Sequence, residues 1–242
     1  MELTSRQKEI LTKMGVERWC SRNSEPALSE DIAADSPDLP LSATIEAGSD
    51  GSVSADVPDL REIAAVVKKC SRCELSRTRN QAVPGSGNSA ADWMFIGEAP
   101  GQNEDEQGLP FVGRAGKLLD AMIKALGMSR EDVFIANVVK CRPPGNRDPL
   151  PEEITNCQPY LQQQLDLVRP KVIVALGRIS AQALLSSAES LGSMRGQVYE
   201  YGKQATPLVV TYHPAYLLRS PEQKNKAWQD LLMAKALVRT AV

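Results

Sequence analysis

The residues best placed to do chemistry lie in one glycine-rich stretch, GEAPGQNEDEQGLPFVGRAG, at residues 97–116. It follows a short apolar run, residues 93–96, that has the pattern of a buried parallel strand. Its glycines and prolines force the chain to turn. Ligands of open α/β sheets bind at the loops that leave the carboxyl ends of strands. Glu98, Glu104 and Phe111 are therefore expected in a binding site, and a plain strand-to-helix connection with solvated acids is the alternative.

Two further polar residues lie within or just after apolar runs. His213 is the only histidine in the chain and follows the run of residues 207–212, while Asn137 interrupts the run of residues 133–139. A lone histidine is often structural, but one at the carboxyl end of a strand in such a sheet is a candidate for a site. A buried amide without partners costs about 1–3 kcal/mol. Asn137 therefore either bonds across the sheet or reads the polar edge of a nucleobase.

The cysteines form a second candidate site. Cys70 and Cys73 have the C-x2-C spacing, Cys141 and Cys157 are separated by fifteen residues, and Cys20 is left outside the set. Four thiolates complete a tetrahedral set for zinc or for an iron–sulfur cluster, and the spacing does not separate the two. The alternative is that Cys141 and Cys157 are ordinary buried residues. Cys141 fits that poorly, because it lies between two cations in a proline-rich loop. Four cations near the set would offset the charge of a thiolate-bound cluster: Arg72, Arg77, Lys140 and Arg142.

Alternating strand and helix patterns predict how these residues are brought together. Short apolar runs predict four strands, and segments of helical periodicity between them predict helices. Parallel strands joined by helices imply an α/β fold of three layers, α/β/α, around a central four-stranded parallel sheet. The strands are expected at residues 93–96, 133–139, 171–176 and 207–212, and the main helices at 60–69, 113–126, 151–168, 180–185 and 226–238.

The first quarter of the chain has a different composition. Residues 1–22 carry the apolar spacing of a short amphipathic helix. Residues 24–57 contain no Lys, Arg or aromatic residue. They cannot bury enough apolar surface to offset the entropy of ordering, so a disordered acidic linker is predicted at residues 23–57. Residues 58–242 are then expected to form one folded domain.

The charge balance permits a nucleic-acid partner without requiring one. Residues 1–57 hold 5 Lys and Arg against 11 Asp and Glu, a net of -6, and residues 58–242 hold 23 against 19, a net of +4. The mildly basic part is compatible with binding a phosphate backbone. No apolar run approaches the roughly 18 residues of a membrane span, and no secretory leader begins the chain. A cytoplasmic, nucleoid-associated protein without a membrane partner is expected.

Several blocks of the sequence resemble a known family. GEAPGQNEDEQGLPFVGRAG, ANVVKCRPPGNR and HPAYLLR, with CSRC and the spaced Cys141 and Cys157, are similar to the family 4 uracil-DNA glycosylases, the bacterial and archaeal iron–sulfur type. The resemblance covers roughly residues 57–242. It implies a monomeric enzyme that cleaves uracil from single- or double-stranded DNA and leaves an abasic site for base-excision repair. It also implies a mainly structural 4Fe-4S cluster on Cys70, Cys73, Cys141 and Cys157.

The resemblance implies roles for the residues that face the base. The enzyme would flip uracil out of the duplex. Phe111 would stack on the flipped ring, and Asn137 would read its polar edge and reject cytosine, whose amino group reverses the donor pattern. The backbone around Glu98 and Ala99 would close the pocket. His213, as a neutral imidazole, would donate to the oxygen of the departing uracil anion.

Further residues would act on the sugar and on the DNA. A carboxylate on the sugar side would position water and favour the cationic sugar. The family pattern implies Glu104 for this task, with Glu98 as the second candidate and Asn146 arranging the site. Three residues after His213 could enter the duplex and fill the vacated stack, with the first turn of a packed helix as the alternative: Leu217, Leu218 and Arg219.

The sequence departs from the family pattern at one position, and two alternative functions stay open. Ala99 stands where some relatives have glycine, and its methyl group could alter the width of the pocket and hence the range of bases. The first alternative is a related iron–sulfur glycosylase of broader deaminated-base specificity. The second is a non-catalytic DNA-binding iron–sulfur module. The N-terminal tail is also a candidate for binding a repair or replication partner.

Overall fold

The fold comes from a computed structural model of the chain that describes residues 59–240. The predicted N-terminal helix at residues 1–22 and the predicted acidic linker at residues 23–57 lie outside the described residues.

The described chain is built on a sheet with strand order β1-β3-β2-β4-β6-β5. The four inner strands pair in parallel, so the predicted four-stranded parallel sheet is confirmed. The outer strands β1 and β5 pair antiparallel and were not predicted. The strands are β1 Ser86–Gly87, β2 Trp93–Gly97, β3 Phe134–Asn137, β4 Val172–Leu176, β5 Val198–Tyr201 and β6 Thr206–Thr211.

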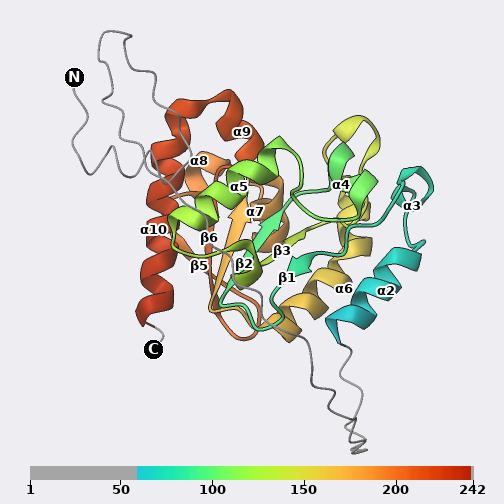
Figure 1. Ribbon diagram of the computed structural model, residues 1–242, viewed down its shortest axis with the longest axis horizontal. Coiled ribbons are helices and arrows are strands. Elements are labelled where there is room, and N and C mark those ends of the chain that lie inside the picture. The colour runs from blue at the N-terminus through green and yellow to red at the C-terminus, as the bar shows by residue number, and fades with distance from the viewer. Residues whose placement is uncertain (1–58, 241–242) are drawn as a thin grey trace, which may run out of the picture. The chain divides into compact units, whose positions relative to one another are not determined.

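Helices cover both faces of this sheet (Figure 1), so the predicted three-layer α/β/α architecture is confirmed. The five predicted helices are present with slightly different ends, and the other, shorter helices carry too few residues to show a periodic pattern. The α-helices are α2 Leu60–Lys69, α3 Leu75–Thr78, α4 Gln102–Gln107, α5 Arg114–Ala125, α6 Pro151–Val168, α7 Arg178–Leu185, α8 Leu191–Met194, α9 Pro214–Arg219 and α10 Lys224–Thr240. The 3-10 turns are η1 Arg130–Asp132, η2 Pro144–Asn146 and η3 Pro221–Gln223.

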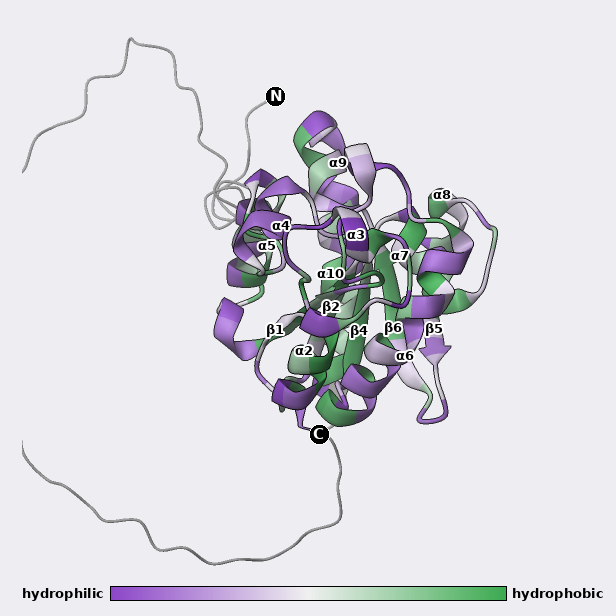
Figure 2. Cartoon of the chain, turned by 90° about the vertical axis from the view of Figure 1, so that its right-hand side faces the viewer, coloured by the Kyte–Doolittle hydropathy of each residue, from purple (hydrophilic) through white to green (hydrophobic). Residues whose placement is uncertain are grey.

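The inner strands are buried on both sides, which explains their continuous apolar sequence. All five residues of β2 are buried. Met94 and Ile96 face the layer of α2, α6, α7 and α8, while Trp93 and Phe95 face the layer of α5, α9 and α10. Figure 2 shows the same arrangement, with hydrophobic strands in the centre and hydrophilic residues on the outer helix surfaces. Parallel sheets with helices on both faces require strands of this kind.

The edge strands lacked a sequence signal for a physical reason. Strand β5 lies at the edge of the sheet, and its residues alternate between exposed and half-buried, with Val198 44% exposed. It forms a hairpin with β6 through a turn in which Gly202 and Ala205 have positive φ angles. Charged and exposed residues such as Glu200 are typical of edge strands and dilute their hydrophobic pattern.

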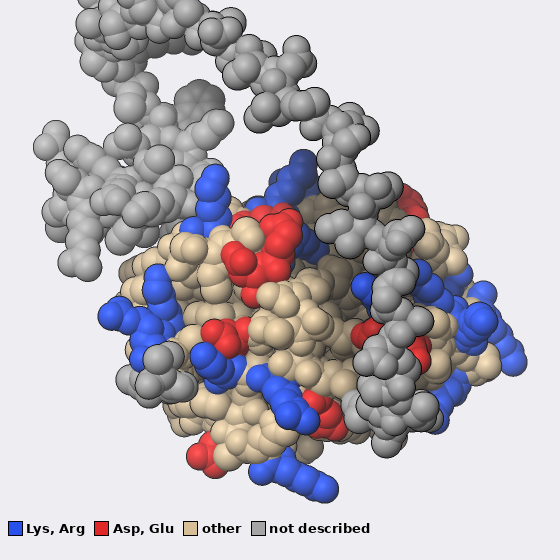
Figure 3. All heavy atoms as spheres, turned by 60° about the horizontal axis from the view of Figure 1, so that its bottom comes forward, with Lys and Arg blue, Asp and Glu red and all other residues tan. Residues whose placement is uncertain are grey.

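The surface mixes both signs of charge. On the face that Figure 3 shows, Lys and Arg are interspersed with Asp and Glu and do not gather into one patch. The mild positive excess of residues 58–242 is therefore not concentrated there. Among the described helices, none is both long enough and apolar enough to cross a membrane.

A buried ion pair fixes the end of β6, where the chain reaches His213. Asp230 on α10 is 3% exposed, and its Oδ2 accepts hydrogen bonds from Thr211 Oγ1 at 2.7 Å and from Arg195 Nε at 2.8 Å. The Arg195 guanidinium also lies 4.2 Å from the centre of the Tyr212 ring. These contacts hold the last residues of β6 against α10.

We expect Asp230→Ala to lower the free energy of unfolding by about 3–5 kcal/mol, because it leaves the Arg195 charge buried without its partner. Denaturant titration of the variant measures this change. The matched control is Asp92→Ala, which removes an exposed pair with Lys171 at 3.4 Å and should cost about 0–1 kcal/mol. Equal losses in the two variants would contradict the role given to the buried pair.

Candidate functional site

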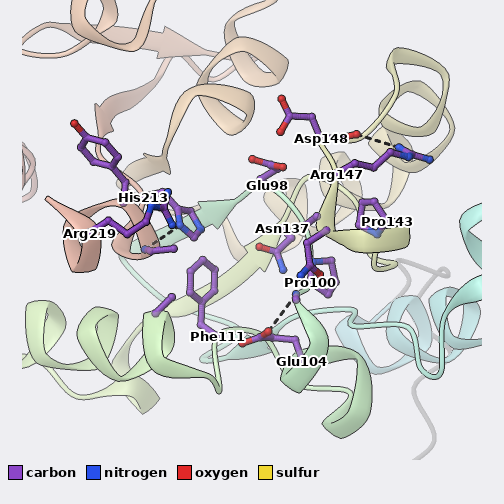
Figure 4. Close-up of a pocket in the computed structure, with 16 residues that line it drawn as sticks. Glu98, Pro100, Glu104, Phe111, Asn137, Pro143, Arg147, Asp148, His213 and Arg219 are labelled. Atoms are coloured by element: carbon purple, nitrogen blue, oxygen red, sulfur yellow. Dashed lines mark hydrogen bonds between the residues drawn. The ribbon is translucent and has the colours of Figure 1, made fainter.

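One cavity of about 470 Å³ opens at the carboxyl ends of the inner strands. The residues predicted to face a base all line it, and Figure 4 shows Glu98, Phe111, Asn137 and His213 around a common space. Ala99 lines the same cavity. Parallel strands place their carboxyl ends at one edge of the sheet, which is why residues far apart in sequence meet here.

Glycines at two strand ends give these side chains their room. Gly97 ends β2 and pairs with Asn137 in the register of β2 and β3. A Cβ atom at Gly97 would lie 2.5 Å from Asn137 Oδ1 and 2.6 Å from Phe111 Cζ. Gly177 follows β4 with φ +93°, and a Cβ there would lie 2.9 Å from His213 Cβ. The pocket therefore depends on the absence of side chains at both positions.

Phe111 is held by its backbone in an uncommon conformation. Its φ is +52°, in the left-handed region that few non-glycine residues adopt. Arg130 donates to the carbonyl of Phe111 at 3.2 Å and also to the carbonyl of Pro110, and it is paired with Asp120 at 2.7 Å. Gly116 lets α5 approach, because a Cβ there would lie 1.8 Å from the Phe111 carbonyl oxygen. No sequence pattern singles out Arg130, because its partners are distant in the chain.

The side-chain oxygen of Asn137 accepts no hydrogen bond from the described residues. Asn137 is 1% exposed. Among the described residues its Oδ1 is the one buried side-chain nitrogen or oxygen without a hydrogen-bond partner. The alternative of a cross-strand hydrogen bond to this oxygen is therefore not realised. A polar atom left unpaired in a pocket costs free energy until a ligand satisfies it.

His213 is fixed as a neutral donor. It is the N-cap of α9, and its Nδ1 accepts a hydrogen bond from the Ala215 N–H at 3.1 Å. The proton of the neutral ring is therefore on Nε2. Burial lowers the pKa of His213 to about 4, assisted by the positive charge of Arg219 and opposed by Glu104. The ring also lies beside Phe111, with 5.6 Å between ring centres.

The carboxyl group of Glu98 is half-buried, and its pKa is raised. The pKa of Glu98 is raised to about 7, mainly by burial and also by the negative charge of Asp148, while the positive charge of Arg178 acts in the opposite direction. Arg178 is paired with Asp148 at 2.7 Å. Asp148 lines the cavity and was not predicted from the sequence. Its position beside a cationic proline-rich loop is the signal that could have drawn attention to it.

The carboxylate of Glu104 accepts hydrogen bonds from three backbone N–H groups. Its Oε1 accepts from the N–H groups of Val112 at 2.9 Å and Gly113 at 3.0 Å, and its Oε2 accepts from Gly101 at 3.1 Å. These bonds tie the start of α4 to the loop that carries Phe111. Glu104 thereby positions the loop. It also lines the cavity, and the water-positioning role implied by the family pattern stays a prediction.

The predicted DNA-binding segment after His213 forms the short helix α9. Leu217 is 1% exposed and packs in the core with the layer of α5 and α10. The expectation that Leu217 enters the duplex is therefore corrected, because the helix turns this side chain inward. Leu218 is 37% exposed, and Arg219 lines the cavity. Asn146 also lines it, with its Oδ1 accepting from Arg142 Nε at 2.8 Å.

The four predicted cysteines line a second cavity, away from the first. Cys141 and Cys157 are buried, and Cys70 and Cys73 are half-buried. Within the described part of the chain, no three His, Cys, Asp or Glu side chains have the spacing required by a single metal ion. The four cysteines nevertheless line one common cavity.

Donors point at the sulfur atoms, as expected for thiolate ligands. Arg79 Nη1 donates to Cys141 Sγ at 2.8 Å, and the Lys140 N–H donates to Cys157 Sγ at 3.2 Å. Arg72 and Lys140 line this cavity as predicted. Two predicted cations lie elsewhere: Arg77 pairs with Glu74 in solvent, and Arg142 bonds Asn146. Arg79 takes their place, and its long-range contacts explain why the sequence did not single it out.

Comparison with known proteins places the chain in a family. The model of the Uracil DNA glycosylase superfamily matches residues 84–232. This is more than half of the chain, so the chain belongs to the uracil-DNA glycosylase superfamily. The resemblance to the type-4 members of that superfamily is also confirmed by individual relatives.

Two relatives are type-4 uracil-DNA glycosylases. The one from Saccharolobus solfataricus is 49% identical over 180 residues, which cover 72% of this chain and 83% of the relative. The one from Pyrobaculum aerophilum is 47% identical over 182 residues, which cover 72% of this chain and 92% of the relative. The type-5 uracil-DNA glycosylase of the same organism is only 32% identical, over 67% of this chain and 78% of the relative.

The titration of Glu98 can be measured directly. We expect a midpoint near pH 7 for its carboxyl carbon by NMR, because burial and Asp148 raise its pKa. Asp148→Asn should lower the midpoint, since it removes a negative charge that opposes ionisation. Arg178→Gln should raise it, since it removes a positive charge that favours ionisation.

The carboxyl group of Glu153 is the internal control. Its hydrogen bond from Arg147 holds its pKa below the usual value, and it should stay there in all three proteins. A Glu98 midpoint near the ordinary glutamate value of about 4.3, or shifts of the wrong sign in the two variants, would contradict this assignment.

Proposed function

We propose that this protein is a uracil-DNA glycosylase that hydrolyses the N-glycosidic bond of uracil in DNA and leaves an abasic site for base-excision repair. It belongs to the superfamily of that activity. The observation that carries the proposal is one pocket in which Phe111, His213 and the unpartnered Oδ1 of Asn137 meet.

Asn137 is proposed to select the base. Uracil offers an N–H donor beside a carbonyl acceptor on its polar edge, and an amide side chain matches both groups with one acceptor and one donor. Cytosine presents the reverse pattern, so it would leave the buried Oδ1 facing another acceptor. Rejection of this kind is strong, because unpaired polar groups are costly in a buried site. Phe111 would stack on the ring of the flipped base.

His213 and Glu98 are proposed to divide the chemistry between them. The glycosidic bond breaks with positive charge on the sugar and negative charge on the departing uracil. The Nε2–H of neutral His213 would donate to the uracil oxygen where negative charge collects, without a proton having to be supplied from solvent. Glu98, ionised above its pKa of about 7, would favour the cationic sugar and orient the attacking water. Glu104 would hold the loop in place.

The cysteine site is proposed to hold a 4Fe-4S cluster on Cys70, Cys73, Cys141 and Cys157. Four cysteine thiolates are the ligand set of such a cluster, in which each cysteine binds its own iron atom, and these four line one cavity. The donors from Arg79 and the Lys140 backbone fit the negative sulfur atoms. When bound, the cluster supplies a cross-link between distant segments.

We also propose that the protein acts as a monomer on the DNA of the nucleoid. The residues assigned to the base and to the chemistry all line one pocket of this chain. Leu218 and Arg219 would contact the duplex beside the flipped base.

The direct test is incubation with an oligonucleotide that contains one uracil, followed by alkali to cleave abasic sites. We expect strand cleavage at the uracil from the cluster-loaded protein. His213→Ala should lower kcat by roughly 10²–10³-fold, the effect of losing one preorganised donor. Asn137→Ala should also lower excision, whereas the control Asn88→Ala, at the other end of the sheet, should leave it unchanged.

Three outcomes would count against the proposal. An intact strand with folded, cluster-loaded protein excludes the activity. DNA binding that survives His213→Ala without cleavage in either protein would indicate the non-catalytic module. Faster release of hypoxanthine or xanthine than of uracil would indicate the glycosylase of broader specificity.

The cluster is tested through the cysteines. Cys141→Ala should lose the visible absorbance of the protein together with much of its solubility, because metal binding and folding are coupled. Cys20→Ala is the matched control, since Cys20 lies outside the predicted ligand set, and it should keep both colour and iron content. A colourless wild-type protein with bound zinc, or a Cys20 variant that also loses iron, would contradict the ligand set.

A further inference from the structure

Lys140 is a buried cation that the proposed chemistry does not use. Its side chain is 1% exposed, although an ammonium group is strongly hydrated and lysine is rarely fully buried without a partner. Its Nζ donates to the backbone carbonyl of Asn137 at 2.8 Å and to Gln164 Oε1 at 2.6 Å. Neither acceptor is a carboxylate. This lysine is therefore held where it is by neutral groups that have a definite geometry.

The backbone of Lys140 is engaged on both sides as well. Its N–H donates to Cys157 Sγ at 3.2 Å, and its carbonyl accepts from the Val83 N–H at 2.7 Å. Gln164 is oriented in turn by the carbonyl of Pro84, which accepts from its Nε2 at 2.7 Å. Cys157 and Gln164 lie on α6 two turns apart, so both face Lys140 from one side of the helix. Lys140 thus joins β3, α6 and the segment before β1.

The contact with Asn137 reaches the base pocket. Asn137 is the last residue of β3, and its carbonyl is held by the ammonium group while its side chain lines the pocket. The Gly97 backbone and the Phe111 ring leave this side chain little room to move. A backbone shift at Asn137 would therefore change where its Oδ1 meets the base. Errors of about 1 Å in such placement can lower the rate roughly a hundredfold.

We propose that Lys140 is a positioning residue that joins the cysteine site to the base pocket, holding the Asn137 carbonyl with its ammonium group and the Cys157 sulfur with its backbone N–H. The proposal rests on the proposed function, because it assigns Asn137 to the base. It implies that a change at the cysteine site is transmitted to base recognition through one residue, by its backbone N–H at one end and its ammonium group at the other.

The chain offers a matched control. Lys235 on α10 also donates its Nζ to a backbone carbonyl, that of Leu126, at 2.7 Å. That carbonyl caps α5 on the other face of the sheet and lines neither cavity. Lys235→Met therefore removes the same kind of hydrogen bond without touching Asn137.

The test is a double-mutant cycle on uracil excision with Lys140→Met and Asn137→Ala. We expect Lys140→Met to lower kcat by roughly 10–100-fold, with a smaller change in KM and with iron content retained. In the Asn137→Ala background the same substitution should cost less than about 3-fold, because the side chain that the carbonyl contact positions is absent. Lys235→Met should behave as the wild type.

A second measurement does not depend on activity. The side-chain amide resonance of Asn137 in ¹H–¹⁵N NMR should shift in Lys140→Met and stay in place in Lys235→Met. If Lys140→Met does not fold, the double variant Lys140→Met, Gln164→Met serves in its place. It removes the ammonium group together with the Gln164 amide, which would otherwise stay buried without its donor.

The outcomes separate this proposal from the proposed function. A wild type that does not release uracil defeats the proposed function, while the NMR comparison still tests the positioning role. Equal losses from Lys140→Met in both backgrounds, or an Asn137 resonance that does not move, would overturn the positioning role while leaving the enzyme assignment intact.

Discussion

The site depends on two glycines that end neighbouring strands in the centre of the sheet. The inner strands lie in the order β3-β2-β4-β6. Gly97 ends β2 and Gly177 follows β4, and each leaves open the space that a side chain from the strand beside it then fills. Asn137 comes from the β3 side and His213 from the β6 side. The absence of side chains at these two central positions thus lets Asn137 and His213, from the flanking strands, face one common cavity.

Burial shifts the pKa values of two pocket residues, Glu98 and His213, in opposite directions. Removal from water disfavours the charged form of each group, so it raises the pKa of Glu98 to about 7 and lowers the pKa of His213 to about 4. Between these values the imidazole is neutral. Above the upper value the carboxyl group is ionised. Burial therefore keeps the His213 imidazole a neutral hydrogen-bond donor, and it delays the ionisation of the Glu98 carboxyl group until the pH exceeds about 7.

The sequence was informative where a property is local in the chain. Buried parallel strands read as continuous apolar runs, and a polar residue within or after such a run, such as Asn137 or His213, stands out. Tertiary contacts produce no comparable pattern in the sequence. The direction of Leu217 depends on its packing beneath α5 and α10. The task of Glu104 depends on backbone N–H groups eight and nine residues away. Arg130 supports the Phe111 backbone from nineteen residues downstream, beyond any periodic pattern.

The cysteine site and the pocket share one stretch of chain. Residues 143 and 146–148 line the pocket, and they lie between Cys141 and Cys157. Arg147 in this stretch is paired with Glu153 at the start of α6, at 2.6 Å. A cluster bound by both cysteines would close this stretch into a loop whose ends cannot separate, which lowers the entropy of its open forms. A cofactor that takes no part in bond cleavage would in this way hold one wall of the pocket, and with it Asp148, at the distance from Glu98 that sets the titration of that carboxyl group.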